Sequence, residues 1–245
     1  FPKIVLMKKF LFACLAVAAL MVTAAYMNPQ PNISGAWSLQ DGTKTKTLVI
    51  TDDYLSMTTF DKENKKFYET KGGVVKISGN KLTLLYEFST TDNGVINTSV
   101  DYTFDVQNGN LVLTQGNTKE TYKRVDDNKG PLAGVWYMSG RVVNDVASAP
   151  RPYGPRKTVK IISGTRFQWV QVNTENKQTG ASGGGTYTFE NGKYTEHIEF
   201  FTRDSSRVGM SLSFEDRVEG KDWHHTGKSS TGQPMHEIWT RAPKQ

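Results

Sequence analysis

The feature that most constrains the fold of this 245-residue chain is an internal repeat whose copies lie 111 to 112 residues apart. Residues 46–50, Lys-Thr-Leu-Val-Ile, match residues 157–161, Lys-Thr-Val-Lys-Ile, and residues 81–88 match residues 193–200. A chain of this length holds one large domain or two smaller ones. The repeat therefore predicts two consecutive domains of the same architecture.

Each copy consists of short segments in which apolar and polar residues alternate, a pattern typical of strands with one buried face. The alternation is clearest at two sets of apolar positions: Val100, Tyr102, Phe104 and Val106, and Val208, Met210, Leu212 and Phe214. The predicted strands cover residues 33–40, 45–51, 54–60, 66–77, 81–88, 98–106, 110–114 and 118–124, then 133–139, 157–162, 165–173, 180–189, 193–201, 207–215, 221–227 and 235–241. Eight antiparallel strands in sequence order close a small barrel. We therefore predict an all-β protein with two consecutive eight-stranded antiparallel up-and-down barrels.

The first 25 residues have the order of a secretory signal peptide, in which a basic pair precedes an apolar stretch and small residues. Met7 is expected to be the true start, which leaves residues 1–6 upstream of it. The predicted divisions are a signal peptide over 1–25 with cleavage near Ala24 to Tyr26, a first barrel over 32–126 and a second barrel over 131–242.

Composition limits the compartment and the classes of partner. The apolar run 10–22 is shorter than the roughly 20 residues of a membrane-spanning helix. Cys14, the only cysteine, would leave with the leader, so the mature chain would contain no thiol, which suits an oxidising compartment. Lipidation of Cys14 stays open as the minor alternative. The net charge would fall from +6 to +3, too little for nucleic-acid binding. We expect a secreted or periplasmic protein with no nucleic acid as partner and no stable membrane span in the mature protein.

The two copies share the residues at which they begin and end. Each opens with Gly-x-Trp, at Trp37 and Trp136, and closes with aromatic-x-Arg, at Arg124 and Arg241. This pattern resembles the lipocalin and calycin signature, in which the closing arginine packs over the opening tryptophan. The resemblance implies that Arg124 covers Trp37 and that Arg241 covers Trp136. Such a cation–π contact stabilises a fold by about 0.5 to 2 kcal/mol.

The second copy is also similar to an uncharacterised lipocalin-like family of secreted bacterial proteins of the Bacteroidota type. The segments that carry this resemblance are 163–169 (Ser-Gly-Thr-Arg-Phe-Gln-Trp), 183–187 (Gly-Gly-Gly-Thr-Tyr) and 222–229 (Asp-Trp-His-His-Thr-Gly-Lys-Ser). The resemblance implies a fold and a secreted address but no substrate or catalytic residue. The triple glycine lacks the lysine and the helix of a phosphate loop, and it predicts a bend or bulge in a strand.

The second barrel is predicted to have an open mouth, because its odd-numbered connections are long and its even-numbered ones are short. The first connection, residues 140–156, contains three prolines and is long enough to act as a lid. Ligand-binding residues expected at this mouth are Arg151, Tyr153, Arg156, Arg203 and Arg207. Arginine binds carboxylate and phosphate groups through two parallel hydrogen bonds. The entrance therefore favours an anionic group, and a solvated rim without a ligand stays open.

Inside the second barrel, the repeat places Glu196 at the position of the core residue Leu84. Because an isolated buried carboxylate is strongly destabilising, Glu196 requires a partner, a ligand or a proton. Together with His225 and Gln171 it would form the polar part of a small-molecule site. The expected apolar wall of that site is Trp169, Tyr187, Tyr194, Met210 and Trp223. A satisfied buried network without a ligand, and a register shift that puts Glu196 in water, stay open.

The sequence contains no established catalytic motif, and neither a metal nor a cofactor is predicted. His224 and His225 are adjacent on a strand and face opposite ways, and His236 is expected to lie apart from them. The leading hypothesis is a binding protein for a small amphipathic or anionic molecule in the second barrel, with the first barrel as a packed scaffold or docking module. The alternatives are a non-catalytic cell-envelope interaction protein with solid barrels and, less favoured, an isomerase or hydrolase that uses Glu196 and His225. Under the leading hypothesis, Glu196→Leu is expected to abolish ligand uptake without loss of stability.

Overall fold

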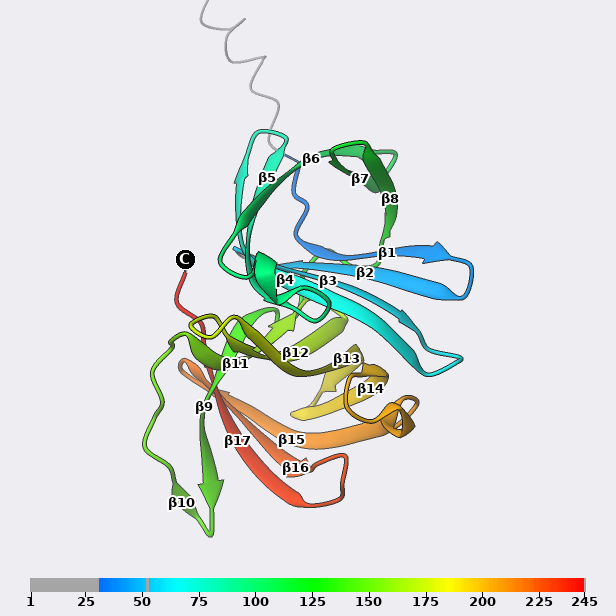
Figure 1. Cartoon of the computed structure of the whole chain (residues 1–245). Helices are drawn as coiled ribbons and strands as arrows, with labels where there is room; N and C mark the ends of the chain where they lie inside the picture. The colour runs from blue at the N-terminus through cyan, green and yellow to red at the C-terminus, as the bar shows by residue number, and fades with distance from the viewer. Residues whose placement is uncertain (1–30, 52, 245) are drawn as a thin grey trace, which may run out of the picture. The chain divides into compact units, whose positions relative to one another are not determined.

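The computed structural model describes residues 31–51 and 53–244, which form two closed antiparallel barrels (Figure 1). Barrel 1 consists of β1 (Gly35–Asp41), β2 (Lys44–Thr51), β3 (Tyr54–Asp61), β4 (Lys66–Ser78), β5 (Lys81–Ser89), β6 (Ser99–Gln107), β7 (Asn110–Gln115) and β8 (Thr118–Arg124). Strand β1 pairs with both β2 and β8, which closes the sheet. The predicted signal peptide, Met7 and Cys14 lie outside the described residues.

Barrel 2 consists of β9 (Gly134–Val143), β11 (Arg156–Ile162), β12 (Arg166–Asn173), β13 (Gln178–Glu190), β14 (Lys193–Phe201), β15 (Ser211–Glu219), β16 (Asp222–Lys228) and β17 (Pro234–Arg241). Strand β9 pairs with both β11 and β17, so this barrel is closed as well. A short strand that the sequence did not predict, β10 (Val146–Ala147), forms a hairpin with β9. The predicted all-β fold with two eight-stranded barrels is confirmed. Within the described ranges, no helix has the length and apolar character that crossing a bilayer requires.

Two predicted strands have limits that differ by four residues from the structure: β9 ends at Val143 rather than at residue 139, and β15 is displaced along the chain. Strand β15 covers Ser211–Glu219 rather than 207–215, because the 3-10 turn η2 (Ser205–Arg207) occupies the chain before it. Val208 is buried in that connection, so its apolar character belongs to the turn and not to the strand. The buried positions of β15 are Phe214 and Asp216. The alternation therefore continues to Asp216, which lies beyond the predicted end of this strand at residue 215. Barrel 1 has a corresponding 3-10 turn, η1 (Asn93–Val95), before β6.

Both barrels bend at a pair of glycines in their longest strand. The pairing of β4 with β5 shifts register between Gly72 and Gly73, and that of β13 with β14 shifts between Gly184 and Gly185. A Cβ atom on Gly73 would clash with the carbonyl oxygen of Leu85, and the same holds for Gly185 and its neighbour across the sheet. Only glycine allows this close approach. The bulge predicted at the triple glycine is confirmed.

The opening tryptophans and closing arginines meet where the first and last strands of each barrel pair. The Arg124 guanidinium lies 3.9 Å from the centre of the Trp37 ring, and that of Arg241 lies 3.9 Å from the Trp136 ring. Each indole also donates a hydrogen bond to the carbonyl oxygen four residues before it, over 2.9 Å in barrel 1 and 2.8 Å in barrel 2. This is the geometry that the lipocalin-like resemblance implies.

Asp126 lies in the linker between β8 and β9, residues 125–133, and binds residues of both barrels. Its carboxylate accepts hydrogen bonds from the backbone N–H of Ala36 (3.1 Å) and from those of Gly164 (3.1 Å) and Thr165 (2.9 Å). The hydroxyls of Ser163 and Thr165 also donate to it. Burial opposes ionisation of Asp126, but the hydrogen bonds that it accepts hold its pKa below the usual value. The 163–169 motif therefore begins with an anchor for the linker.

The two barrels also contact each other directly. The Thr58 hydroxyl donates to Gln168 over 2.8 Å, and the Gln168 amide donates to the Thr70 hydroxyl over 2.7 Å. The rings of Phe60 and Phe200 pack with their centres 5.4 Å apart. Strand alternation predicts Phe200 inside barrel 2, but the bulge beside it displaces the ring to this contact. Because Gln168 is buried and bonded across the contact, it positions barrel 2 rather than lining a site.

Candidate functional site

Barrel 2 contains a cavity of about 240 Å³ at the end of the barrel where the long connections lie. The lining of this barrel 2 cavity is Met138, Arg141, Thr158, Lys160, Trp169, Gln171, Glu196, Ile198, Phe201, Leu212, Phe214, His225, Ser229, Ser230, Met235, Glu237 and Trp239. Buried aromatic residues, Trp136 and Tyr194 among them, fill the closed end of the barrel. An engineered apolar cavity of about 150 Å³ holds a benzene molecule. The barrel 2 cavity therefore has room for a molecule somewhat larger than benzene.

A buried ion pair lies in this cavity. The Lys160 ammonium is 3.1 Å from a carboxylate oxygen of Glu196, and the two side chains are 3% and 6% exposed. The ammonium also lies 4.8 Å from the ring centres of both Trp223 and Trp239. Two charges can remain buried here because each compensates the other and the aromatic faces attract the cation.

The same positions in barrel 1 are apolar. Lys160 is paired across the sheet with Trp136, as Leu48 is with Trp37, so Lys160 takes the place of Leu48. By the same comparison of strand registers, Glu196 takes the place of Leu84. The ion pair is therefore a specific feature of barrel 2 and is not required by the fold.

A second polar pair lies beside the first. The His225 ring contacts Asp216 through Nδ1 over 3.0 Å, and the Trp223 indole donates to the other carboxylate oxygen of Asp216 over 2.8 Å. Burial raises the pKa of Asp216 to about 7. Burial also lowers the pKa of His225 well below its usual range, with a smaller contribution from the Lys160 charge. Asp216 is paired with His225 between β15 and β16, as Phe104 is paired with Leu113 between β6 and β7. The polar pair therefore takes the positions of two apolar residues of barrel 1.

Glu237 is a further carboxylate that lines the barrel 2 cavity together with Lys160 and Glu196. Its carboxylate accepts a hydrogen bond from the Trp239 indole over 3.1 Å and lies 3.4 Å from the Arg141 guanidinium. Burial raises its pKa. Glu237 occupies the position of Glu120 in barrel 1, so this carboxylate is common to both barrels.

The strand directions arrange the cavity in layers. Below it lies the aromatic end, and at its base are Lys160, Glu196, His225 and Glu237. Nearer the mouth, β14, β15 and β17 contribute the apolar side chains of Ile198, Phe201, Leu212 and Met235, whereas β9, β11 and β12 contribute Arg141, Thr158 and Gln171. The Tyr194 hydroxyl, buried beneath this base, has no hydrogen bond of ordinary geometry among the described residues. The cavity is therefore charged at its base, and its upper wall is apolar on the side that β14, β15 and β17 form.

The residues predicted inside the barrel fall into three groups. Glu196, His225, Gln171 and Trp169 line the cavity. Trp223, Tyr194 and Tyr187 are buried beneath it, with Tyr187 bonded to the carbonyl oxygen of Ser163. Met210 lies in the connection before β15 and does not line the cavity, because the strand starts later than predicted. Gln171 is an exposed residue at the mouth, where it accepts hydrogen bonds from Arg203 and from the Ala181 backbone.

The predicted mouth residues are spread over a wider surface. Arg151 and Arg156 line an open groove that shares Arg141 and Gln171 with the barrel 2 cavity, and no carboxylate is among the described residues that line it. Arg207 lies in η2 rather than inside a strand, and it pairs with Asp204 over 2.9 Å. Tyr153 lies apart from the cavity and packs edge-on against Tyr137. We call the surface around Arg141, Arg151 and Arg156 the arginine groove.

Sequence reasoning missed Lys160, although it lies within the repeat. Residues 46–50 were matched to 157–161 at an offset of 111, which set Lys160 against Val49. The strand registers require an offset of 112, as in the match of 81–88, and this sets Lys160 against Leu48. A uniform offset of 112 would have shown that two core leucines are replaced by opposite charges. The expectation that Glu196→Leu causes no loss of stability left out the charge of Lys160, and with this ion pair present we expect a loss of stability instead.

The histidines do not gather around a common point. His224 contacts His236, with Nδ1 and Nε2 3.0 Å apart, which corrects the expectation that His236 lies apart from it. Among the described residues, no group of three or more His, Cys, Asp or Glu side chains is arranged to hold a metal ion. Glu196 and His225 are each bonded to another partner, Lys160 and Asp216, and no hydrogen bond joins them. Glu196 and His225 are thus held by different partners.

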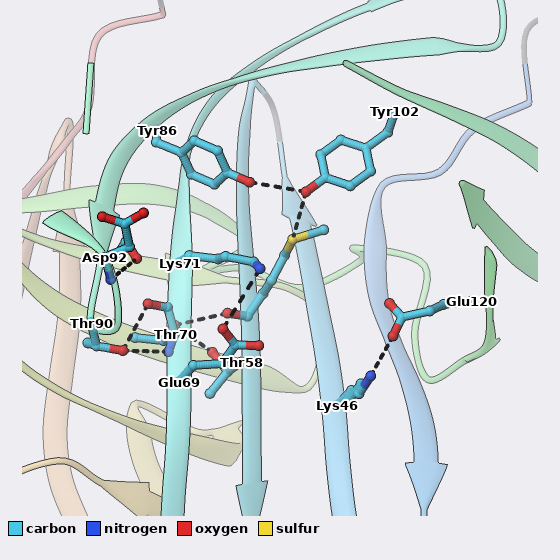
Figure 2. A network of polar contacts seen from close by, with 12 residues as sticks. Lys46, Thr58, Glu69, Thr70, Lys71, Tyr86, Thr90, Asp92, Tyr102 and Glu120 are labelled. Atoms are coloured by element: carbon cyan, nitrogen blue, oxygen red, sulfur yellow. Dashed lines mark hydrogen bonds and ion pairs between the residues drawn. The ribbon is translucent and has the colours of Figure 1, made fainter. Parts of the chain in front are cut away.

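Barrel 1 is not fully packed either. It has a smaller cavity of about 160 Å³, lined by charged and phenolic side chains (Figure 2). Lys46 and Glu120 form an ion pair of 2.5 Å on one side of it. The expectation that barrel 1 is a solid scaffold is therefore wrong at its mouth, although its deeper interior is apolar.

The comparison with known proteins concerns barrel 2. Residues 131–245 match the model of a family described as "Domain of unknown function (DUF4488)". The match begins at the end of the linker and covers the whole of barrel 2, so barrel 2 is similar to that family. The chain matches no curated protein.

Proposed function

We propose that the protein binds a small amphipathic molecule in the barrel 2 cavity. The observation that supports this most directly is the layering of that cavity, with Lys160, Glu196 and His225 at the base and the apolar side chains of β14, β15 and β17 on one side toward the mouth. Ligand sites are typically apolar pockets in which a few polar groups fix the orientation of the ligand. The ligand would enter with its polar head first and leave its apolar part against the upper wall.

The charges at the base favour a head without net charge. Among the lining residues, Glu196 and Glu237 balance Lys160 and Arg141. An anionic head would add an uncompensated charge beside two carboxylates, which is costly in a buried site. A hydroxyl or amide can instead accept from Lys160 and donate to Glu196. An acidic group on the same ligand would lie in the arginine groove outside.

The main alternative is a non-catalytic protein with solid barrels that acts through its surface in the cell envelope. The volume of the barrel 2 cavity counts against it, since the cavity exceeds by several-fold the roughly 30 Å³ that one water occupies. We further propose a secreted or periplasmic location, supported by the leader-like order of residues 1–25. Mass spectrometry of the protein from its own source would find a new N-terminus near Tyr26 if the leader is removed.

Tryptophan fluorescence tests the binding proposal, because four of the five tryptophans lie in barrel 2. The probes are benzyl alcohol, benzamide, benzoate and benzylamine, which share one ring and differ in the head. We expect saturable quenching by the two neutral probes and at least about tenfold weaker binding of the two ions. The double variant Lys160→Leu/Glu196→Leu should lose this discrimination between heads. Equal, non-saturable quenching by all four probes would contradict the proposal.

A further inference from the structure

Barrel 1 carries a second, chemically different set of polar groups inside its mouth. The lining of its cavity includes Lys46 and Glu120 from β2 and β8, and Glu69 and Lys71 from β4. Figure 2 shows these side chains pointing into the same space from different strands. Two cations and two carboxylates therefore share a cavity of about 160 Å³. None of these four residues was expected from the sequence to form a site.

The two ion pairs differ in strength. Lys46 and Glu120 lie 2.5 Å apart, and the Tyr122 hydroxyl also donates to Glu120 over 2.6 Å. The hydrogen bond with Glu120 raises the pKa of Lys46. Lys71 and Glu69 are 3.8 Å apart, too far for a hydrogen bond, and their side chains remain 32% and 35% exposed. The second pair thus has unused hydrogen-bonding capacity toward the cavity.

Phenol groups lie beside these charges. The hydroxyls of Tyr86 and Tyr102 are 3.1 Å apart, and Tyr102 also contacts the sulfur of Met57 over 3.8 Å. Tyr102 and Tyr122 line the cavity together with Glu69 and Glu120. In barrel 2 the position of Lys71 is taken by Gly183, where a Cβ atom would meet the Trp169 and Phe201 rings. The pair of Glu69 with Lys71 is therefore specific to barrel 1, just as the buried pair of Lys160 with Glu196 is specific to barrel 2.

We propose that the barrel 1 cavity binds a small zwitterion, a molecule that carries one ammonium and one carboxylate group, between Glu69 and Lys71. The four charges of the cavity sum to zero, so a simple anion or cation would bring in one charge without a counter-charge. A zwitterion adds no net charge, with its carboxylate beside Lys71 and its ammonium beside Glu69. The volume is close to the roughly 150 Å³ that accommodates a ring of six carbon atoms. The ligand is thus of amino-acid size.

Isothermal titration calorimetry of the full chain tests this proposal with β-alanine and γ-aminobutyrate as zwitterions, and with acetate, ethylamine and glycerol as comparison probes. We expect saturable heat for at least one zwitterion and at least about tenfold weaker binding of every comparison probe. Saturable binding of acetate or ethylamine with equal affinity, or no saturable binding of either zwitterion up to about 10 mM, would overturn the proposal.

Variants locate the site. Lys71→Met and Glu69→Gln should each weaken binding of the zwitterion at least about tenfold, because each removes one charge-assisted contact. Lys76→Met removes an exposed lysine from the same strand and should leave binding unchanged. The double variant Lys160→Leu/Glu196→Leu alters only barrel 2 and should also leave it unchanged. Circular dichroism confirms that each variant is folded. Loss of binding in the barrel 2 variant with retention in both β4 variants would overturn the assignment to barrel 1.

Discussion

Barrels 1 and 2 have the same strand order, the same contact of a closing arginine with an opening tryptophan and the same glycine bulge. They differ in where charged side chains lie inside the barrel. Barrel 1 has leucines, Leu48 and Leu84, where barrel 2 has the ion pair of Lys160 with Glu196. Barrel 1 instead holds its charges nearer the mouth, where they are partly exposed. The comparison shows that this framework tolerates charge at its centre when the charges are introduced as a pair.

The largest expected effect comes from giving barrel 2 the interior of barrel 1 in two steps. Glu196→Leu should destabilise the protein by about 3 to 5 kcal/mol, because it leaves the buried ammonium of Lys160 without its counter-charge. Lys160→Leu/Glu196→Leu should restore stability to within about 1 kcal/mol of the parent or exceed it, because well-packed apolar residues can replace a buried pair. Chemical denaturation measures both. A single variant as stable as the parent would show that the two charges are not coupled.

Substitution of Asp126 tests whether the stability of the protein depends on the contacts of the linker with both barrels. Asp126→Ala should destabilise the protein by about 1 to 3 kcal/mol, because donors from both barrels lose a charged acceptor that is itself half-solvated. Asp127→Ala is the matched control, since that exposed carboxylate pairs with the exposed Lys129 and its loss should have no measurable effect. Thermal unfolding in which the two variants shift equally would contradict the anchoring role.

The pH dependence of stability separates the two interiors further. The pKa of Asp216 is raised to about 7, so between its unfolded value near 3.8 and pH 7 the folded state holds more protons and stability falls as pH rises. The lowered pKa of His225 acts in the opposite direction below pH 6.5, since the unfolded state then binds the additional proton. Asp216→Asn should remove the first contribution only. Relative to the parent, this variant should therefore gain about 1 to 3 kcal/mol of unfolding free energy between pH 5 and pH 8. Parallel curves for the two proteins would show that Asp216 does not titrate in this range.

The smallest expected difference lies at the closed ends. Arg241→Ala should destabilise by about 1 to 2 kcal/mol and Arg124→Ala by about 0.5 to 1 kcal/mol, because both lose a cation–π contact but Arg241 is the more buried of the two. Both arginines also donate to a backbone carbonyl oxygen, Arg241 to that of Ala133 over 2.5 Å and Arg124 to that of Ser34 over 3.0 Å. Urea denaturation of the two variants measures the difference. An effect of Arg124→Ala that is equal or larger would contradict this ranking.

Strand limits could be predicted from the sequence because alternation and turn residues act locally. Where a different local structure intervened, the prediction failed: η2 shifts the start of β15, which moved Met210 out of the interior and Asp216 into it. The position of Glu196 inside the barrel followed from the repeat. Its partner did not, because Lys160 lies 36 residues away on another strand and only the correct register of β11 brings the two together. The contacts of Gln168 and Phe200 across the barrels depend on tertiary packing that no local pattern encodes.

The central claim is that barrel 2 encloses a ligand cavity with charged side chains at its base. A crystal structure of the protein soaked with benzyl alcohol tests this claim most directly. We predict density for the ring against the upper wall of the barrel 2 cavity, with the hydroxyl within hydrogen-bonding distance of Lys160 or Glu196. A cavity that remains empty of the probe at saturating concentration, or that is filled by the protein's own side chains, would contradict the account.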